Sequence, residues 1–165
     1  MSTPPMSLIR SITLFTPLLL LLAACSGEPP MDKKTQLMTT LQNLEAAIEK
    51  KGVDEFFSQV SDDFKVSERG WNKKDAERFL RIRLMKNKTV HVHQMVKRID
   101  WQNDGDQQAE VEVVAAMAGT DISLDELPSF RGDMAKFVVT FNKIDDQYII
   151  THASWQRATP ADFVF

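Results

Sequence analysis

Three histidines are the side chains best suited to chemistry in this chain, and two of them are closely spaced. His91 and His93 are separated by one residue within a predicted strand, and His152 lies in another predicted strand near the C-terminus. Residues two apart on a strand share a face, with Cα atoms about 6.5 Å apart. Such a pair can supply two metal ligands, with His152 as a third, or one imidazole can act as a general base. Alternatively, these rings lie near a pocket rim, hydrogen-bonded to backbone or partly hydrated. Spacing does not show convergence, so no metal and no cofactor is predicted.

Two β-hairpins are the elements that must position these histidines. Thr89–Trp101 and Gln107–Ala118 are long predicted strands of a first hairpin. In a second hairpin, Phe137–Phe141 alternates apolar and polar residues, Asp145-Asp146 supplies a turn, and Tyr148–Trp155 returns. The second half of the chain is therefore predicted to be an antiparallel sheet with one buried face.

The turn of the first hairpin sets its preferred register. Gly105 can adopt the left-handed conformation of a three-residue loop at Asn103-Asp104-Gly105. The expected inward pairs are Ile99–Ala109, Met95–Val113, His93–Ala115 and His91–Met117. The expected outward pairs are Arg98–Glu110 and Val96–Glu112, so the outer face carries the charges. A two-residue turn at Asp104-Gly105 would mix charged and apolar residues on each face, and the first register is favoured.

The second hairpin allows two registers. One points Tyr148, Ile150 and His152 inward, and the other points Ile149, Ala153 and Trp155 inward. We favour the first, in which His152 joins the other two histidines on the buried face.

Three helices are predicted ahead of the sheet. Apolar residues recur at helical spacing between Asp32 and Lys51 and again over Val53–Val60, and Phe64–Val66 then alternates like a short strand. Asn72 can cap a third helix, with Asp75 in its first turn. The apolar faces of these helices are expected to form the core.

The N-terminal segment resembles a bacterial lipoprotein signal. Arg10 precedes the apolar stretch Ile12–Ala24, which is shorter than the roughly 20 residues of a membrane-spanning helix. Leu22-Ala23-Ala24-Cys25 resembles a lipobox, in which the cysteine is acylated and everything upstream is removed. The alternative is an uncleaved N-terminal anchor, which the change to Ser26–Pro30 disfavours. Ser26 stands where an enteric inner-membrane lipoprotein carries Asp, so the resemblance implies anchoring at Cys25 to the outer membrane, facing the periplasm.

These features divide the chain into residues 1–24 (signal peptide), 25–31 (lipidated cysteine and tether) and 32–165 (one folded domain). Removal of residues 1–24 leaves 141 of the 165 residues and moves the formal charge from −3 to −4. A chain of this size can bury one hydrophobic core. The mild negative charge gives no reason to expect nucleic acid as a partner. Cys25 is the only cysteine, so no intramolecular disulfide is expected.

The order of elements resembles the nuclear transport factor two-like superfamily, which includes ketosteroid isomerases and polyketide cyclases. The resemblance spans Thr35 to Arg157 and rests on the strand start at Asp63-Phe64, the helix entry over Trp71–Lys86 and the pattern Tyr148-x-Ile150-x-His152. It implies an α+β fold in which a strongly curved antiparallel sheet wraps three N-terminal helices as a cone with a pocket at its wide end. Because this fold hosts enzymes, ligand binders and dimerisation modules, it does not by itself assign an activity.

The expected pocket residues follow from these registers and from the large aromatic side chains. They are Trp71, His91, His93, Met95, Trp101, Met117 and His152. Family isomerases use an inward acid with a tyrosine-containing oxyanion site. Tyr148 is the only tyrosine here, and Glu110 and Glu112 are expected to face outward, so that constellation is not evident.

Three functions therefore remain open. The first is binding of a small apolar or amphipathic ligand in the cone by a membrane-anchored domain without catalysis. The second is homodimerisation or partner binding through the outer sheet face, where Val92, Val96 and Val114 are expected beside Arg98 and Glu112. The third is an isomerase, cyclase or dehydratase that uses a pocket histidine. Ligand binding is favoured, and dimerisation is compatible with it.

Overall fold

The computed structural model describes residues 31–120, 122 and 132–164. The fold described below is that of the unit that begins at Met31. The predicted signal segment and the lipidation candidate Cys25 lie outside the described residues. Among the described residues, no helix is long and apolar enough to cross a membrane.

Three helices open the domain: α1 (Lys33–Glu49), α2 (Val53–Ser58) and α3 (Lys73–Met85). Their starts follow from local hydrogen bonding. The Asp32 carboxylate accepts from the backbone N–H groups of the first turn of α1, and Asn72 and Asp75 form a reciprocal capping box at the start of α3. The three predicted helices, including the cap at Asn72, are confirmed.

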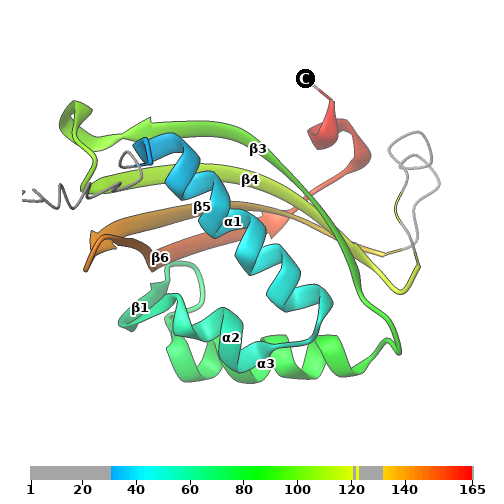
Figure 1. Cartoon of the computed structure of the whole chain (residues 1–165). Coiled ribbons are helices and arrows are strands. Elements are labelled where there is room, and N and C mark those ends of the chain that lie inside the picture. The colour runs from blue at the N-terminus through cyan, green and yellow to red at the C-terminus, as the bar shows by residue number, and fades with distance from the viewer. Residues whose placement is uncertain (1–30, 121, 123–131, 165) are drawn as a thin grey trace, which may run out of the picture. The chain divides into compact units, whose positions relative to one another are not determined.

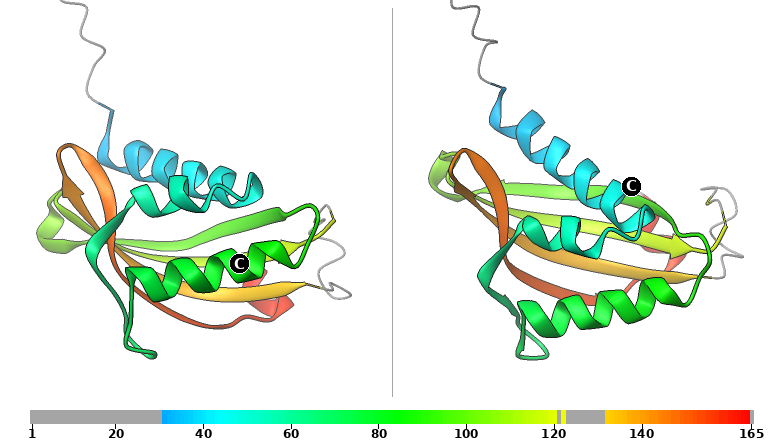
Figure 2. Two further views of the ribbon diagram at one scale, coloured as in Figure 1. Left: turned by 90° about the horizontal axis from the view of Figure 1, so that it is seen from below. Right: turned by 60° about the horizontal axis from the view of Figure 1, so that its bottom comes forward.

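Six strands form one curved sheet in the order β2-β1-β6-β5-β4-β3. Their bounds are β1 (Val60–Val66), β2 (Trp71–Asn72), β3 (His91–Trp101), β4 (Gln108–Ala118), β5 (Asp133–Ile144) and β6 (Gln147–Arg157). The β3–β6 hairpins are antiparallel as predicted, whereas β1 runs parallel to β6, so the sheet is mixed. The three helices lie on one side of the sheet, inside its curve (Figures 1 and 2).

The main core lies between α1 and the inner face of the sheet. Leu37 and Leu41 of α1 pack in one cluster with Val111, Phe141 and Tyr148, all of them buried. The end of the sheet near the start of α1 is also tied by polar contacts. Lys33 Nζ donates to the Gly105 carbonyl at 2.9 Å. The Tyr148 hydroxyl donates to the Asp106 carbonyl at 2.8 Å.

A β-bulge in β3 overturns the predicted register of the first hairpin. Ile99 pairs with Val111 and Val96 with Val113, so two residues of β3, Lys97 and Arg98, face one residue of β4. The extra residue reverses the alternation. Inward side chains are Ile99 and Trp101 on one side of the bulge and Val92, Gln94 and Val96 on the other. His91, His93 and Met95, which pair with Ala118, Ala116 and Val114, are therefore on the outer face, contrary to the prediction.

The turn of this hairpin also differs from the prediction. The left-handed residue is Asn103, with φ 54°, and Gly105 has an extended backbone with φ −78°. A short 3-10 turn over Gln102–Asp104 replaces the expected three-residue loop. The longer connection shifts the strands by two residues near the turn, and the bulge then reduces that shift by one.

A second bulge in β6 combines the two registers considered for the last hairpin. Phe141 pairs with Ile150, whereas Thr140 pairs with His152, so Thr151 is the extra residue. Tyr148 and Ile150 point inward before the bulge, and the core contacts of Ala153 and Trp155 are inward after it. The favoured register was right for Tyr148 and Ile150 and wrong for His152, which is exposed.

The C-terminal segment covers part of the outer face. A 3-10 turn over Pro160–Phe163 is closed by a capping box between Thr159 and Asp162. Phe163 is 4% exposed and packs in a small cluster with Val114 and Ala116 of β4. Two of the three valines predicted on the outer face, Val92 and Val96, instead pack against the main core. The third, Val114, is covered by the chain itself.

The bulge at Thr151 yields a stability prediction. Deletion of Thr151 would restore regular alternation and force two of the four inward apolar side chains of β6 out of the core. Because each fully buried large apolar side chain contributes roughly 1.5–3 kcal/mol, the deletion should abolish cooperative thermal unfolding measured by circular dichroism. Thr151→Ala, which keeps the bulge and loses only the 3.3 Å hydroxyl bond to the Thr140 carbonyl, should unfold cooperatively. A deletion variant as stable as Thr151→Ala would show that the bulge is not needed.

Tyr148 gives a second prediction, which can be read spectroscopically because it is the only tyrosine. Burial raises the pKa of the Tyr148 phenol above its ordinary value of 10.0. A raised folded-state pKa stabilises the fold fully below pH 10, and this contribution is lost as the pH rises through the folded pKa. Phenolate absorbance should therefore appear at higher pH in native than in denatured protein. Tyr148→Phe should cost about 1 kcal/mol of unfolding free energy, because the Asp106 carbonyl loses its donor. Phenol titration curves that coincide for native and denatured protein would contradict the predicted rise in the pKa of Tyr148.

Candidate functional site

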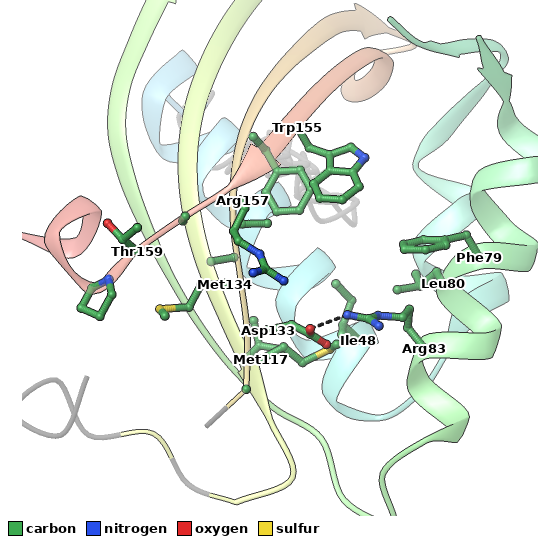
Figure 3. Close-up of a pocket in the computed structure, with 17 residues that line it drawn as sticks. Ile48, Phe79, Leu80, Arg83, Met117, Asp133, Met134, Trp155, Arg157 and Thr159 are labelled. Atoms are coloured by element: carbon green, nitrogen blue, oxygen red, sulfur yellow. Dashed lines mark ion pairs between the residues drawn. The ribbon is translucent and has the colours of Figure 1, made fainter. Parts of the chain in front are cut away.

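A pocket of about 530 Å³ opens at the end of the sheet where β4 and β6 finish and β5 begins. Its walls come from α1, α3, the inner face of the sheet and the C-terminal segment (Figure 3). Most of the lining side chains are apolar. They include Ile48, Phe79, Leu80, Val92, Ala115, Met117, Met134, Ala135, Phe137 and Trp155. The volume and the apolar lining are those of a small-molecule site.

Two alanines on neighbouring strands leave the space on the sheet side. Ala115 of β4 pairs with Ala135 of β5, and the same inner row continues to Gln94 of β3 and Arg157 of β6. Because alanine side chains end at Cβ, the middle of this row cannot fill the hollow. Gln94 at one end of the row is held to α1, since its amide nitrogen donates to the Glu45 carboxylate at 2.6 Å. Burial raises the pKa of Glu45, and this donation opposes the rise.

An aromatic and cationic stack forms the side of the pocket next to α3. The Arg69 guanidinium lies 4.8 Å from the ring centroids of both Trp71 and Trp155. The Trp71 ring in turn lies 5.1 Å from that of Phe79 on α3. A cation at this distance from a ring face is attracted to it by roughly 0.5–1 kcal/mol at an exposed site. Trp155 and Phe79 both line the pocket, so the stack holds two of its walls.

Three charged side chains line the pocket at its open end. Arg83 of α3 and Asp133 at the start of β5 form an ion pair. The third, Arg157, ends β6 and is exposed, and among the described residues its guanidinium makes no hydrogen bond or ion pair. Figure 3 shows Arg157 pointing into the hollow between Trp155 and the Arg83–Asp133 pair. The lining thus combines apolar walls with one paired and one unpaired arginine.

Of the seven predicted pocket residues, only Met117 lines this pocket. Trp71 lies one layer behind, stacked on Arg69. Met95 pairs with Val114 on the outer face. Trp101 points inward but lies at the opposite end of the domain, 5.9 Å from the Tyr148 ring, where it lines a shallower groove with Lys34 and Met38.

The three histidines do not converge. His93 packs on the outer face, with its ring 6.3 Å from that of Phe163, and its buried Nε2 has no hydrogen-bond partner among the described residues. His91 shares that face of β3. His152 is exposed on β6, three strands away, where its Nε2 lies 2.8 Å from the Ser67 hydroxyl. Within the described ranges, no group of three His, Cys, Asp or Glu side chains is placed to hold a metal ion.

Sequence reasoning missed the charged and small residues that distinguish this pocket: Arg83, Ala115, Asp133, Ala135 and Arg157. The alternation that placed Trp155 on one face extends by two residues to Arg157, and it could have placed that side chain beside the pocket. The pairing of Ala115 with Ala135 could not be anticipated, because no register linked β4 to β5. The Arg83–Asp133 pair joins a helix to a strand 50 residues later, and no local pattern marks it.

Comparisons by sequence assign no family, since no protein-family model matches the chain and no curated protein matches it. Solved structures do match. A candidate scytalone dehydratase from Novosphingobium aromaticivorans superposes with a TM-score of 0.59 at 12% identity, covering 77% of this chain and 85% of that one. An NTF-2 like protein of unknown function from Shewanella oneidensis superposes with a TM-score of 0.59 at 13% identity, covering 75% and 98%.

A third match is Bd1075 of Bdellovibrio bacteriovorus, with a TM-score of 0.58 and 18% identity over 74% of this chain. The matched region spans only 40% of that longer chain. At such identities, the similarity concerns the fold and carries no activity across. These superpositions agree with the observed architecture, a curved six-stranded sheet with three helices on its inner side. The domain has the nuclear transport factor two-like fold.

Proposed function

We propose that this domain binds a small apolar or amphipathic molecule in the pocket between α3 and the inner face of the sheet. The observation that carries the proposal is the cavity of about 530 Å³ with predominantly apolar walls. Burial of a ligand there would be favourable by roughly 0.8 kcal/mol for each methylene removed from water. The Ala115–Ala135 pair supports the proposal, because larger side chains in that row would fill the hollow.

Binding is better supported than catalysis by the described lining residues. They include a single carboxylate, Asp133, which is paired with Arg83, and they include no histidine. The histidine-dependent isomerase, cyclase or dehydratase considered above therefore has no imidazole at this pocket. The fold similarity to candidate dehydratases does not supply one.

We also propose that the mature protein is anchored to the outer membrane through a lipid on Cys25. The support is the apolar stretch followed by Leu22-Ala23-Ala24-Cys25. On this proposal, the folded domain follows the tether in sequence, and α1 begins at Lys33, which contacts the β3–β4 turn. The pocket includes Ile48 at the other end of α1, a helix of 17 residues and about 25 Å. The ligand would enter at the end of the domain opposite the start of α1.

The pocket can be tested by filling it. Ala135→Phe should weaken binding of the neutral probe N-phenylnaphthylamine at least about tenfold, equivalent to 1.4 kcal/mol, because the new ring would occupy the hollow. Probe fluorescence enhancement on titration with the full-length protein gives the affinity. Val138→Phe, on the outer face of the same strand, should bind as the unmodified protein does. Equal affinity of the two variants for the probe would show that the probe binds outside this pocket.

Tryptophan fluorescence locates the bound probe independently. Trp155 lines the pocket, whereas Trp101 lies at the opposite end of the domain. Trp155→Phe should therefore remove most of the quenching that the probe causes, and Trp101→Phe should keep it. Quenching that depends on Trp101 would assign the probe to the groove beside α1 and would contradict the proposed site.

Anchoring has its own test. The unmodified protein should incorporate labelled fatty acid in a bacterial host and fractionate with membranes. Cys25→Ser should incorporate no label, because it removes the only thiol that can be acylated. Cys25→Ala serves as a second non-acylatable variant. Incorporation of labelled fatty acid into either variant would show that the lipid is attached at a residue other than Cys25.

A further inference from the structure

We propose that the ligand of this pocket is a single-chain amphipathic carboxylate, whose carboxylate binds the Arg157 guanidinium while its apolar chain lies against the Ala115–Ala135 row. This inference rests on the proposed function and adds the charge and the orientation of the ligand. It follows from the position of Arg157, from the charges around the pocket and from the surfaces beneath the guanidinium.

Arg157 is placed by the sheet rather than by a loop. It is the last residue of β6 and pairs with Ala135, so its side chain leaves the sheet from the inner face. The next backbone N–H along, that of Ala158, donates to the Met134 carbonyl at 3.1 Å and continues the strand pairing past Arg157. Figure 3 shows the guanidinium directed into the hollow. A side chain rooted in paired backbone can present its donors to a ligand in a defined direction.

The charge balance at the pocket favours an anion. Arg83 and Asp133 form an ion pair and cancel, which leaves the charge of Arg157 as the net charge of the described lining residues. A guanidinium offers paired N–H donors that match both oxygens of a carboxylate. Because Arg157 is exposed, its donors are accessible to a carboxylate that enters the pocket from solvent. An uncharged ligand would leave these donors to solvent.

The surfaces next to Arg157 are suited to an apolar chain. Ala135 lies across the strand pair from it, and Trp155 and Phe137 form the next inner row of the sheet. On the opposite side, Leu80 and Ile48 line the hollow from the two helices. A carboxylate held at Arg157 therefore has an apolar wall on each side for the carbon chain attached to it. A short polar anion would use only the arginine.

The experiment compares dodecanoate with dodecanol, which share a carbon chain and differ in charge. The full-length protein is reconstituted in phosphatidylcholine vesicles, and binding is followed by the quenching of N-phenylnaphthylamine fluorescence on its displacement, with protein-free vesicles subtracted. At neutral pH, the unmodified protein should bind dodecanoate at least about tenfold more tightly than dodecanol. Arg157→Gln should lower dodecanoate affinity to that of dodecanol and leave dodecanol unchanged, and Arg157→Lys should retain part of the preference.

Asp133→Asn provides a variant with the opposite expected sign. It releases Arg83 from its partner and adds one positive charge at the pocket, so dodecanoate should bind several-fold more tightly and dodecanol should not. Because this variant gains affinity, unfolding cannot mimic its effect. Circular dichroism of all variants checks the fold.

The outcomes separate the inference from the proposed function. Equal binding of dodecanoate and dodecanol by the unmodified protein would overturn the anion preference and leave apolar binding in place. Binding of neither, with no binding of the neutral probe, would overturn both. A dodecanoate preference that survives in Arg157→Gln would overturn the assignment to Arg157, as would an equal gain for both ligands in Asp133→Asn.

Discussion

Two β-bulges keep the large apolar side chains of β3 and β6 on the inner face of the sheet on both sides of each bulge. In β3, the inward side chains change from Val92 and Val96 to Ile99 and Trp101 across the bulge at Lys97 and Arg98. In β6, three places from β3 in the sheet, the bulge at Thr151 has the same effect on the inward side chains. Extra residues of this kind bend a strand and increase its twist. The curve around the helices, the hollow at one end and the position of every candidate residue on β3 and β6 depend on these two insertions.

The same bulges mark where prediction from sequence succeeded and where it failed. Helical periodicity, the Asn72 cap and the two hairpins were sufficient to predict the element order, because these signals are local. The cone fold was implied by the resemblance of that order to a known superfamily. The assignment of side chains to the inner or outer face of the sheet, in contrast, depends on pairing between strands and not on local signals alone. Strict alternation from Ile99 places His93 inward, and one inserted residue places it outward beside Phe163. Both registers of the last hairpin held for part of β6. The residue types of Lys97 and Thr151 do not indicate a β-bulge. Strict alternation therefore placed three histidines at the pocket, and none of them lines it.

Small side chains on the inner face of the sheet and an arginine at the end of β6 define the pocket. The paired alanines Ala115 and Ala135 leave space where the core elsewhere is filled by side chains such as Val111 and Phe141. Interiors normally pack without such voids, since unfilled space forfeits dispersion contacts. This hollow instead keeps apolar walls around an open space, and the Arg69 stack contacts the Trp155 ring on one of them.

The two ends of the domain differ in a way that bears on where such a ligand comes from. At the end where α1 begins, the chain is closed by polar contacts from Lys33 and Tyr148 to backbone carbonyls of the β3–β4 turn. At the other end, the strand termini spread around the pocket, and Arg157 faces it. A ligand of the proposed kind would therefore reach the hollow from the end of the domain opposite the start of α1, because the strand ends leave the pocket accessible there and Arg157 is exposed beside it.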